Sequence, residues 1–125
     1  PQGGIEDDEV PSQTVIRELE EETGTNQVEI ISEATNWLTY DFPDELLHHI
    51  WGGKFRGQAQ KWFALVFNGS DSDFDLNTHN TPEFDMWRWV ELGQITDLIV
   101  PFKRKLYESI VHEFADIPPR IRSLR

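Results

Sequence analysis

The sequence has 125 residues, of which 38% are hydrophobic and 27% charged, the size and composition of one globular domain with a modest core. Its formal net charge of −12 argues against a broad nucleic-acid-binding surface, because affinity for a phosphate backbone comes largely from Lys and Arg. It contains no cysteine for a disulfide bond or a thiolate metal site, and no apolar run approaches the roughly 18 residues that span a membrane. We therefore expect a cytoplasmic protein with no membrane or DNA partner.

The first predicted element is a helix with signals at both ends. Pro11 suits its first turn, and either Ser12 or the acidic run before it can satisfy the free N–H groups there. Gly24 stands where a left-handed C-cap is expected. Gly3 and Gly4, ahead of the helix, permit the backbone to approach a phosphate or a metal ion closely.

This helix carries three carboxylates on one face. Glu18, Glu21 and Glu22 are spaced at offsets of three and four, so they fall within an arc of about 60°. Like charges at these spacings destabilise an isolated helix by roughly a few tenths of a kcal/mol per pair, which calls for a compensating cation. Carboxylate oxygens are the ligands that Mg²⁺ and Mn²⁺ prefer. The alternative interpretation is a solvated acidic face. Arg17 precedes Glu21 by four residues and can hold it in one rotamer.

Strand-like segments follow the helix. Residues 28–31 are short and β-branched, residues 35–40 alternate, and residues 58–67 form an apolar and aromatic run that is the strongest strand prediction. Between them, residues 44–57 are predicted to form a turn of helix and an irregular loop. A further short strand is expected near residues 74–76. A last strand is expected to contain Trp87 and Trp89, whose indoles share one face and are interpreted as core.

The C-terminal part is predicted to be helical. Residues 91–98 form a short helical turn, and Pro101 opens the final helix. Its buried stripe is expected to be Leu106, Ile110, Val111 and Phe114. Two consecutive prolines at 118–119 are expected to end it and to leave a mobile basic tail. The predicted organisation is one domain over residues 1–117 and a tail over 118–125.

The stretch from Gly3 to Thr25 resembles the signature box of the Nudix hydrolases. The fixed positions of that pattern are matched from Gly3 through Glu9 to the run that begins at Arg17 and ends at Gly24, and Thr25 departs from the aliphatic residue usual in the family. The resemblance implies that the catalytic divalent ions, Mg²⁺ with Mn²⁺ as an alternative, are held by Glu18, Glu21, Glu22 and the Gly3 carbonyl. It implies structural roles for Gly4, Glu9, Arg17 and Gly24.

The resemblance also implies a fold. It is an α/β (α+β) fold, in which helices and a central mixed sheet form an α/β/α sandwich. The sequence opens on Pro1, only two residues before the box, whereas the relatives carry a further segment there that forms strands of this sheet. We therefore expect the domain as given to lack those N-terminal strands.

Beyond the box, the chain looks like the bacterial RNA pyrophosphohydrolases, and it is similar over the same stretches to the plant-type asymmetric dinucleoside tetraphosphate hydrolases. The matching stretches are residues 36–40, 56–63, 81–90 and 101–107. The resemblance implies that Glu83 is a further metal ligand or a base. It implies that Tyr40 and Lys61 contact phosphates and that Phe102 and Lys103 hold the first base of the RNA.

The implied reaction is hydrolysis of a phosphoanhydride. Pyrophosphate, or phosphate in steps, would leave the 5′ end of triphosphorylated or diphosphorylated RNA, and a 5′ monophosphate would remain. Glu18, Glu22 and Glu83 would be catalytic, with Glu18 the first choice of general base and Glu83 its rival. Two other functions stay open: cleavage of a dinucleoside polyphosphate into ATP and AMP, and a nucleotide-binding module without turnover. The oligomeric state is left open.

Overall fold

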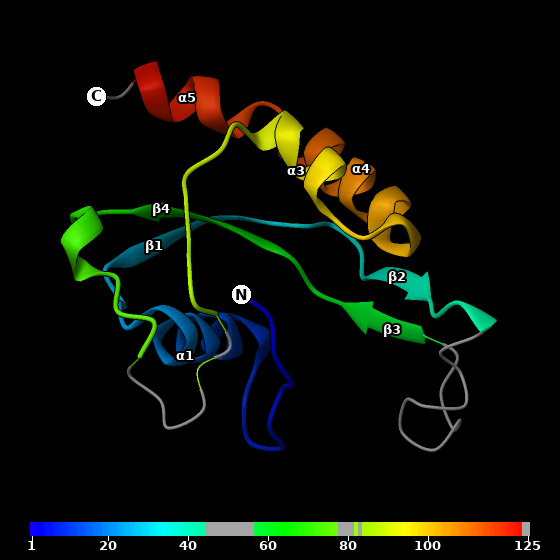
Figure 1. Ribbon diagram of the computed structural model, residues 1–125, viewed down its shortest axis with the longest axis horizontal. Coiled ribbons are helices and arrows are strands. Elements are labelled where there is room, and N and C mark those ends of the chain that lie inside the picture. The colour runs from blue at the N-terminus through cyan, green and yellow to red at the C-terminus, as the bar shows by residue number, and fades with distance from the viewer. Residues whose placement is uncertain (45–56, 78–81, 83, 124–125) are drawn as a thin grey trace. The chain divides into compact units, whose positions relative to one another are not determined.

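A computed structural model of the chain describes residues 1–44, 57–77, 82 and 84–123 (Figure 1). The chain divides into two compact units, each built from two separate stretches. Unit 1 contains Pro1–Glu33 and Phe63–Trp89, and unit 2 contains Ala34–Trp62 and Val90–Arg125. The mixture of helices with small sheets confirms the predicted α/β class. Among the described helices, none has the length and apolar character needed to cross a lipid bilayer.

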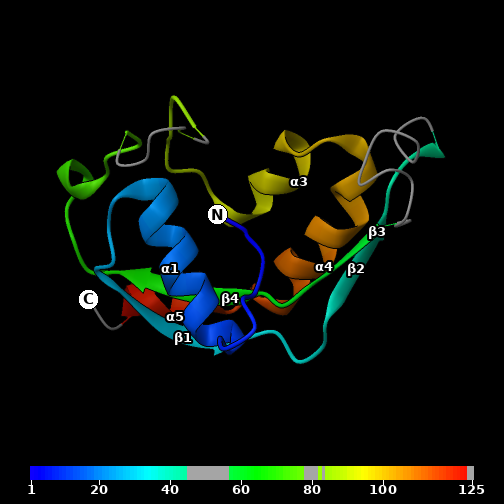
Figure 2. The ribbon, with the colours of Figure 1, turned by 90° about the horizontal axis from the view of Figure 1, so that it is seen from below.

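Unit 1 combines a helix with an antiparallel pair of strands. Strand β1 (Val28–Glu33) pairs with β4 (Phe63–Phe67), from the partners Val28 and Phe67 to the partners Glu33 and Phe63. The register shifts between Ile30 and Ser32, which places a bulge in β1. Helix α1 (Pro11–Thr23) lies on one side of this pair in Figure 1 and crosses over it in Figure 2.

The ends of α1 follow the expected chemistry, except at the N-cap. Pro11 is the first helical residue, as predicted. The cap is not Ser12, which lies inside the helix; instead the Val10 N–H donates to Gln13 Oε1 at 3.1 Å. Gly24 has the predicted left-handed conformation, with φ 79° and ψ −1°, and its N–H donates to the Glu20 carbonyl at 2.8 Å.

The predicted strand over residues 58–67 is two strands. Its first half is β3 (Gly57–Gln60), which pairs with β2 (Leu38–Asp41), and its second half is β4, which pairs with β1. The chain leaves regular pairing at Lys61 and Trp62 because the two halves have different partners. The strand expected over residues 35–40 begins only at Leu38.

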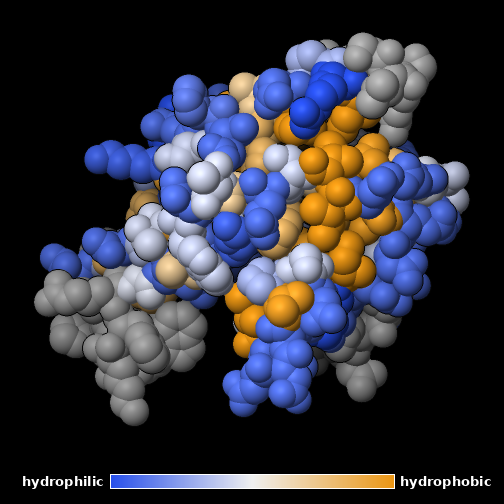
Figure 3. Space-filling model, turned by 180° about the vertical axis from the view of Figure 1, so that it is seen from behind, coloured by the Kyte–Doolittle hydropathy of each residue, from blue (hydrophilic) through white to orange (hydrophobic). Residues whose placement is uncertain are grey.

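Unit 1 also differs from prediction after β4. A short 3₁₀ helix, η2 (Asp71–Asp73), follows, and neither residues 74–76 nor residues 84–90 form a strand. Trp87 and Trp89 are 40% and 60% exposed, so their interpretation as core residues is wrong. Their indoles pack perpendicular to each other at 5.9 Å, and Phe74 lies 4.3 Å from Trp87 between ring centroids. Aromatic contacts hold this extended segment where a strand ladder was expected. Figure 3 shows hydrophobic residues reaching the surface among hydrophilic ones.

Unit 2 holds the second antiparallel pair and the C-terminal helices. Strands β2 and β3 pair from Leu38 with Gln60 to Asp41 with Gly57. The short helices η3 (Leu92–Gln94), α3 (Ile95–Leu98) and η4 (Pro101–Lys103) lead into α4 (Arg104–Glu113) and α5 (Ile117–Ser123). The expected core residues Leu106, Ile110 and Phe114 are at most 5% exposed, and Val111 is half-buried.

The proline pair does not end a helix. Pro118 and Pro119 lie in the first turn of α5, where backbone N–H groups have no helical partner and proline therefore costs little. Residues 120–123 of the tail expected to be mobile are helical. The boundaries of the predicted domain and tail stay a prediction, and the loop expected between residues 44 and 57 lies almost wholly outside the described residues.

Candidate active site

Arg17 ties the segment before α1 to the acidic face of that helix. Its Nε and Nη2 atoms donate to the two carboxylate oxygens of Glu9 at 2.7 and 2.9 Å. Nη2 also donates to the Gly4 carbonyl at 2.9 Å. The remaining nitrogen, Nη1, donates to Glu18 Oε1 at 2.8 Å and lies 3.3 Å from Glu21 Oε2. These charge-assisted bonds hold the acidic face of α1 against the glycine-containing segment before the helix. The structural roles of Gly4, Glu9 and Arg17 stay a prediction.

The Glu9–Arg17 pair stays ionised over a wide pH range. The hydrogen bonds from Arg17 lower the pKa of Glu9 to about 2, although partial burial opposes the change. The Thr14 hydroxyl, 2.8 Å from Glu9 Oε1, and the Glu6 N–H, 3.2 Å from it, act in the same direction as Arg17. The Glu9 carboxylate in turn raises the pKa of Arg17. The anchor of the site is therefore permanent at physiological pH.

Gly3 lies directly against Glu18. A Cβ atom placed at Gly3 would overlap the Glu18 carboxylate, whereas a Cβ at Gly4 would meet nothing within 4 Å. The absence of a side chain at Gly3 thus leaves room for the Glu18 carboxylate beside the backbone. This places the backbone of Gly3 next to one of the predicted carboxylate ligands.

The three predicted metal-binding carboxylates differ in burial. The side chains of Glu18 and Glu22 are 16% and 7% exposed, and that of Glu21 is 38% exposed. Glu22 Oε2 lies 3.9 Å from the amino nitrogen of Pro1. Ionised carboxylates this far from water need cationic or hydrogen-bonding neighbours. A purely solvated acidic face does not describe Glu18 and Glu22.

As placed, the described carboxylates, imidazoles and other candidate ligands include no group of three or more that converges on one point. Arg17 Nη1 contacts both Glu18 and Glu21, so a metal ion shared by these two carboxylates would compete with the guanidinium. Glu9 retains Arg17 through two further bonds if they turn away. The donor set is all oxygen and fits Mg²⁺ or Mn²⁺. Glu83, the fourth predicted carboxylate, lies outside the described residues.

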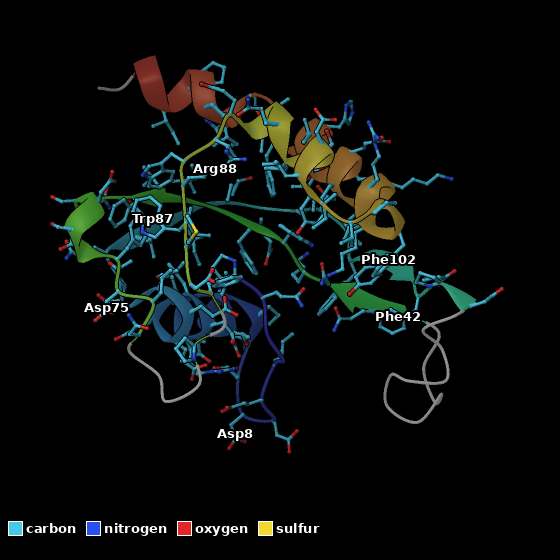
Figure 4. The ribbon with its side chains drawn as sticks, viewed as in Figure 1. Asp8, Phe42, Asp75, Trp87, Arg88 and Phe102 are labelled. Carbon is cyan, nitrogen blue, oxygen red and sulfur yellow. The ribbon has the colours of Figure 1, made fainter. Side chains whose placement is uncertain are left out.

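Three of the four predicted substrate residues lie together in unit 2. The rings of Tyr40 and Phe102 are 5.8 Å apart between centroids. Lys103 Nζ lies 5.2 Å from the Tyr40 centroid and 5.8 Å from that of Phe102, within cation–π range. Residues distant in the sequence thus form one cluster of two rings and a cation. Figure 4 shows its member Phe102 beside the β2–β3 pair.

Lys61, the fourth predicted substrate residue, makes a different contact. Its ammonium donates to the Ala34 carbonyl at 2.7 Å, while the Ala34 N–H donates to the Trp62 carbonyl at 2.8 Å. Lys61 therefore helps to fix the chain where β3 ends and regular pairing is lost. An ammonium has three donor hydrogens, so this bond leaves capacity for a phosphate oxygen.

Sequence reasoning missed two side chains at the Tyr40 cluster, Gln58 and Phe42. The Tyr40 hydroxyl donates to Gln58 Oε1 at 2.9 Å, and that oxygen also accepts from Gln60 Nε2 at 2.9 Å. Burial is the main cause that raises the pKa of Tyr40, and repulsion from ionised Tyr107 is the second cause. The signal for Gln58 is the antiparallel register that places it opposite Tyr40. Phe42 follows Tyr40 by two residues on the same alternation.

Comparison with known proteins gives one consistent result. A sequence model of the NUDIX domain matches residues 1–110. The RNA pyrophosphohydrolase of Rhodospirillum rubrum is 51% identical over 115 residues, which are 92% of this chain and 69% of that protein. The RNA pyrophosphohydrolase of Novosphingobium aromaticivorans is 51% identical over 94% of this chain and 74% of its own length. The RNA pyrophosphohydrolase of Rickettsia canadensis is 48% identical over 91% of this chain and 70% of its own length.

Proposed function

The chain belongs to the Nudix family of hydrolases, and from that premise we propose that it removes pyrophosphate, or phosphate in steps, from the 5′ end of triphosphorylated or diphosphorylated RNA. The product would be RNA with a 5′ monophosphate. The observation that carries the proposal is the identity of about half the residues, over most of the chain, to several RNA pyrophosphohydrolases. The Arg17-anchored acidic face supports it, because phosphoanhydride hydrolysis needs concentrated negative charge to hold cations near the phosphates.

The residues that would hold the metal are Glu18, Glu21 and Glu22, with the Gly3 carbonyl beside them and Glu83 as a further candidate. A bound Mg²⁺ or Mn²⁺ supplies positive charge that offsets the phosphate oxygens and makes an attacking water more acidic. Arg17 keeps the carboxylates of this face oriented before substrate arrives. Because Gly3 has no side chain, the Glu18 carboxylate can lie against the backbone at this point.

Glu18 is our first choice to accept the proton of the attacking water, with Glu83 as its rival. One of its oxygens, Oε1, accepts the bond from Arg17, so the other remains to receive a proton. Arg17 and the space beside Gly3 would hold the Glu18 carboxylate in the orientation in which it receives this proton and becomes a neutral carboxyl group.

Substrate contacts are assigned to the unit 2 residues. Tyr40 and Lys61 would contact the phosphates, and a lysine there neutralises charge that develops in the transition state. Phe102 would stack on the first base, an interaction worth about 1–3 kcal/mol that tolerates any base. Lys103 lies over two rings and would make a polar contact with the same nucleotide.

The test is a side-by-side assay in Mg²⁺ of a short 5′-triphosphorylated RNA and diadenosine tetraphosphate at equal concentration. We expect preferential release of pyrophosphate or phosphate from the RNA. The net charge of −12 favours a small substrate over long RNA, which is why the dinucleotide is included. Preferential formation of ATP and AMP would show that the enzyme cleaves dinucleoside polyphosphates instead. No turnover of either compound would favour a nucleotide-binding module.

A matched set of variants tests the carboxylates. Glu18→Gln and Glu22→Gln should each lower kcat by about two orders of magnitude or more, because each removes a charge that would hold the metal. Glu20→Gln is the control, since Glu20 is exposed on another face of the same helix. Unchanged melting temperatures would show that the fold persists. A near-normal kcat in both Glu18→Gln and Glu22→Gln would contradict the assignment of these carboxylates to the metal site.

A further inference from the structure

A third ring supports the residues assigned to the first base. Phe42, the residue after β2, is 9% exposed, whereas Tyr40 and Phe102 are half-buried. Its ring meets Tyr40 edge-on, with centroids 5.7 Å apart and planes at 80°. The centroids of the Phe42 and Phe102 rings are 6.5 Å apart, and their planes are at 68° (Figure 4). With the 5.8 Å contact between Tyr40 and Phe102, the three rings form a closed triangle.

The triangle has a buried corner and a solvent-accessible side. Lys103 is half-buried, and its ammonium lies over the rings of Tyr40 and Phe102. Phe42 is the most buried of the three rings, so it reaches the other two from the interior of unit 2. A base that stacks on Phe102 must approach from the accessible side, which leaves Phe42 out of direct contact with it.

Phe42 restricts how Phe102 can turn. Tyr40 is itself fixed by the bond from its hydroxyl to Gln58. Phe102 packs against Tyr40 with its plane tilted by 48°, and against Phe42 edge-on. Aromatic pairs prefer particular relative orientations, so both neighbours bias the plane of Phe102. Without Phe42 one of these two constraints is lost, and binding of a base would have to order a freer ring.

We propose that Phe42 is a positioning residue, which holds the Phe102 ring in the orientation that accepts the first base of the RNA. This inference rests on the proposed function and deepens it, because it extends base recognition to a residue that does not touch the substrate. The effect should fall on binding of the base and spare the chemical step at the carboxylates.

The test compares two 5′-triphosphorylated RNAs, one with a normal first base and one with an abasic first nucleotide. Phe42→Leu, which keeps apolar volume but lacks a flat ring, and Phe42→Ala are measured in KM and kcat. Dissociation constants for noncleavable imidotriphosphate forms of the same RNAs are measured in Mg²⁺. We expect KM and Kd for the base-bearing RNA to rise about 3- to 10-fold, a part of the stacking contribution, with kcat within about twofold. The abasic RNA should show no such change.

Two further measurements separate positioning from general packing. Phe114→Leu is the matched control, because Phe114 is also a buried phenylalanine of unit 2, at 5% exposure against 9% for Phe42, and lies at the C-terminal end of α4. It should lower the melting temperature without a base-dependent change in Kd. In a Phe102→Ala background, Phe42→Leu should have no further effect on Kd, because the two residues act as one unit.

Equal losses on both RNAs, an unchanged Kd, or a Phe42 effect that persists without Phe102 would each overturn the inference. Failure of the wild-type protein to hydrolyse the triphosphorylated RNA would instead overturn the proposed function. The binding measurements still decide the role of Phe42 in that case, since they need no turnover. If the wild-type protein binds the two RNAs equally, no base contact exists and the inference falls.

Discussion

Substitution of Gly3 by alanine should impair the reaction while leaving the fold intact. The structure describes one glycine with positive φ, Gly24, so alanine is sterically allowed at positions 3 and 4 as far as their backbones are concerned. At position 3, however, the new Cβ would overlap the Glu18 carboxylate. The carboxylate is the flexible end of a side chain, so it would yield rather than the backbone.

The size of this displacement sets the expected effect. To reach ordinary van der Waals contact the Glu18 carboxylate carbon must move by about 1.5–2 Å, and a misplacement of even about 1 Å can cost on the order of 100-fold in rate. That loss corresponds to about 2.7 kcal/mol in the activation barrier. We therefore expect Gly3→Ala to lower kcat on triphosphorylated RNA by roughly 30- to 100-fold.

The neighbouring glycine provides the control. A Cβ at Gly4 meets nothing within 4 Å, and the carbonyl that accepts from Arg17 is unaffected by the substitution. Gly4→Ala should keep kcat within about threefold of the wild type, since no side chain is displaced. Both variants should melt within a few degrees of the wild type. Equal activities of the two variants, or unfolding of Gly3→Ala, would refute the reasoning.

Two further predictions concern stability. Gly24→Ala should lower the free energy of unfolding by about 1 kcal/mol, because a left-handed residue with a Cβ costs about 1–2 kcal/mol and alanine recovers part of this in the unfolded chain. A thermal melt should show a melting temperature lower by a few degrees, with kcat retained. An unchanged melting temperature would contradict the role of Gly24 as the C-cap. Arg17 lowers the pKa of Glu9 from its ordinary value of 4.5 to about 2. The ionised carboxylate therefore contributes fully to the free energy of unfolding above pH 4.5, and this contribution is lost as the pH falls toward 2. Denaturant unfolding from pH 6 to pH 3 should therefore show the difference between wild type and Glu9→Gln narrowing as pH falls, and a constant difference would argue against the ion pair.

Local physics was sufficient for the acidic helix. Its carboxylate face follows from offsets of three and four, and its ends follow from Pro11 and Gly24, because helix periodicity and capping depend on residues close in the sequence. The cap expected at Ser12 was wrong because the helix already begins at Pro11, which places Ser12 inside it and makes Val10 the N-cap residue. The roles of Glu9 and Arg17 came from the family pattern, and the structure supplies the bonds behind them.

The strand predictions were wrong where pairing with residues far away in the sequence decides the bounds of a strand. Residues 58–67 read as one apolar run, yet Gln60 pairs with Leu38 and Phe63 pairs with Glu33, and no local signal states that the partner changes. Trp87 and Trp89 alternate as a strand would, but aromatic packing holds the segment without a ladder. The proline pair was taken as a stop because proline breaks helix interiors, whereas these prolines stand in a first turn.

From the amino-acid sequence alone one could predict an acidic helix face and a family pattern that covers most of the chain. The contacts between distant side chains, including those of Glu9 with Arg17, were established by the folded structure. The folded structure also brought Tyr40 against Phe102 and Lys103, joined Tyr40 to Gln58, and placed Phe42 behind the cluster. This division follows from the distance along the chain over which each interaction acts. Periodicity and capping act within a few residues, whereas cross-strand register and ring packing join residues far apart in the chain, and their outcome depends on how the intervening segments fold.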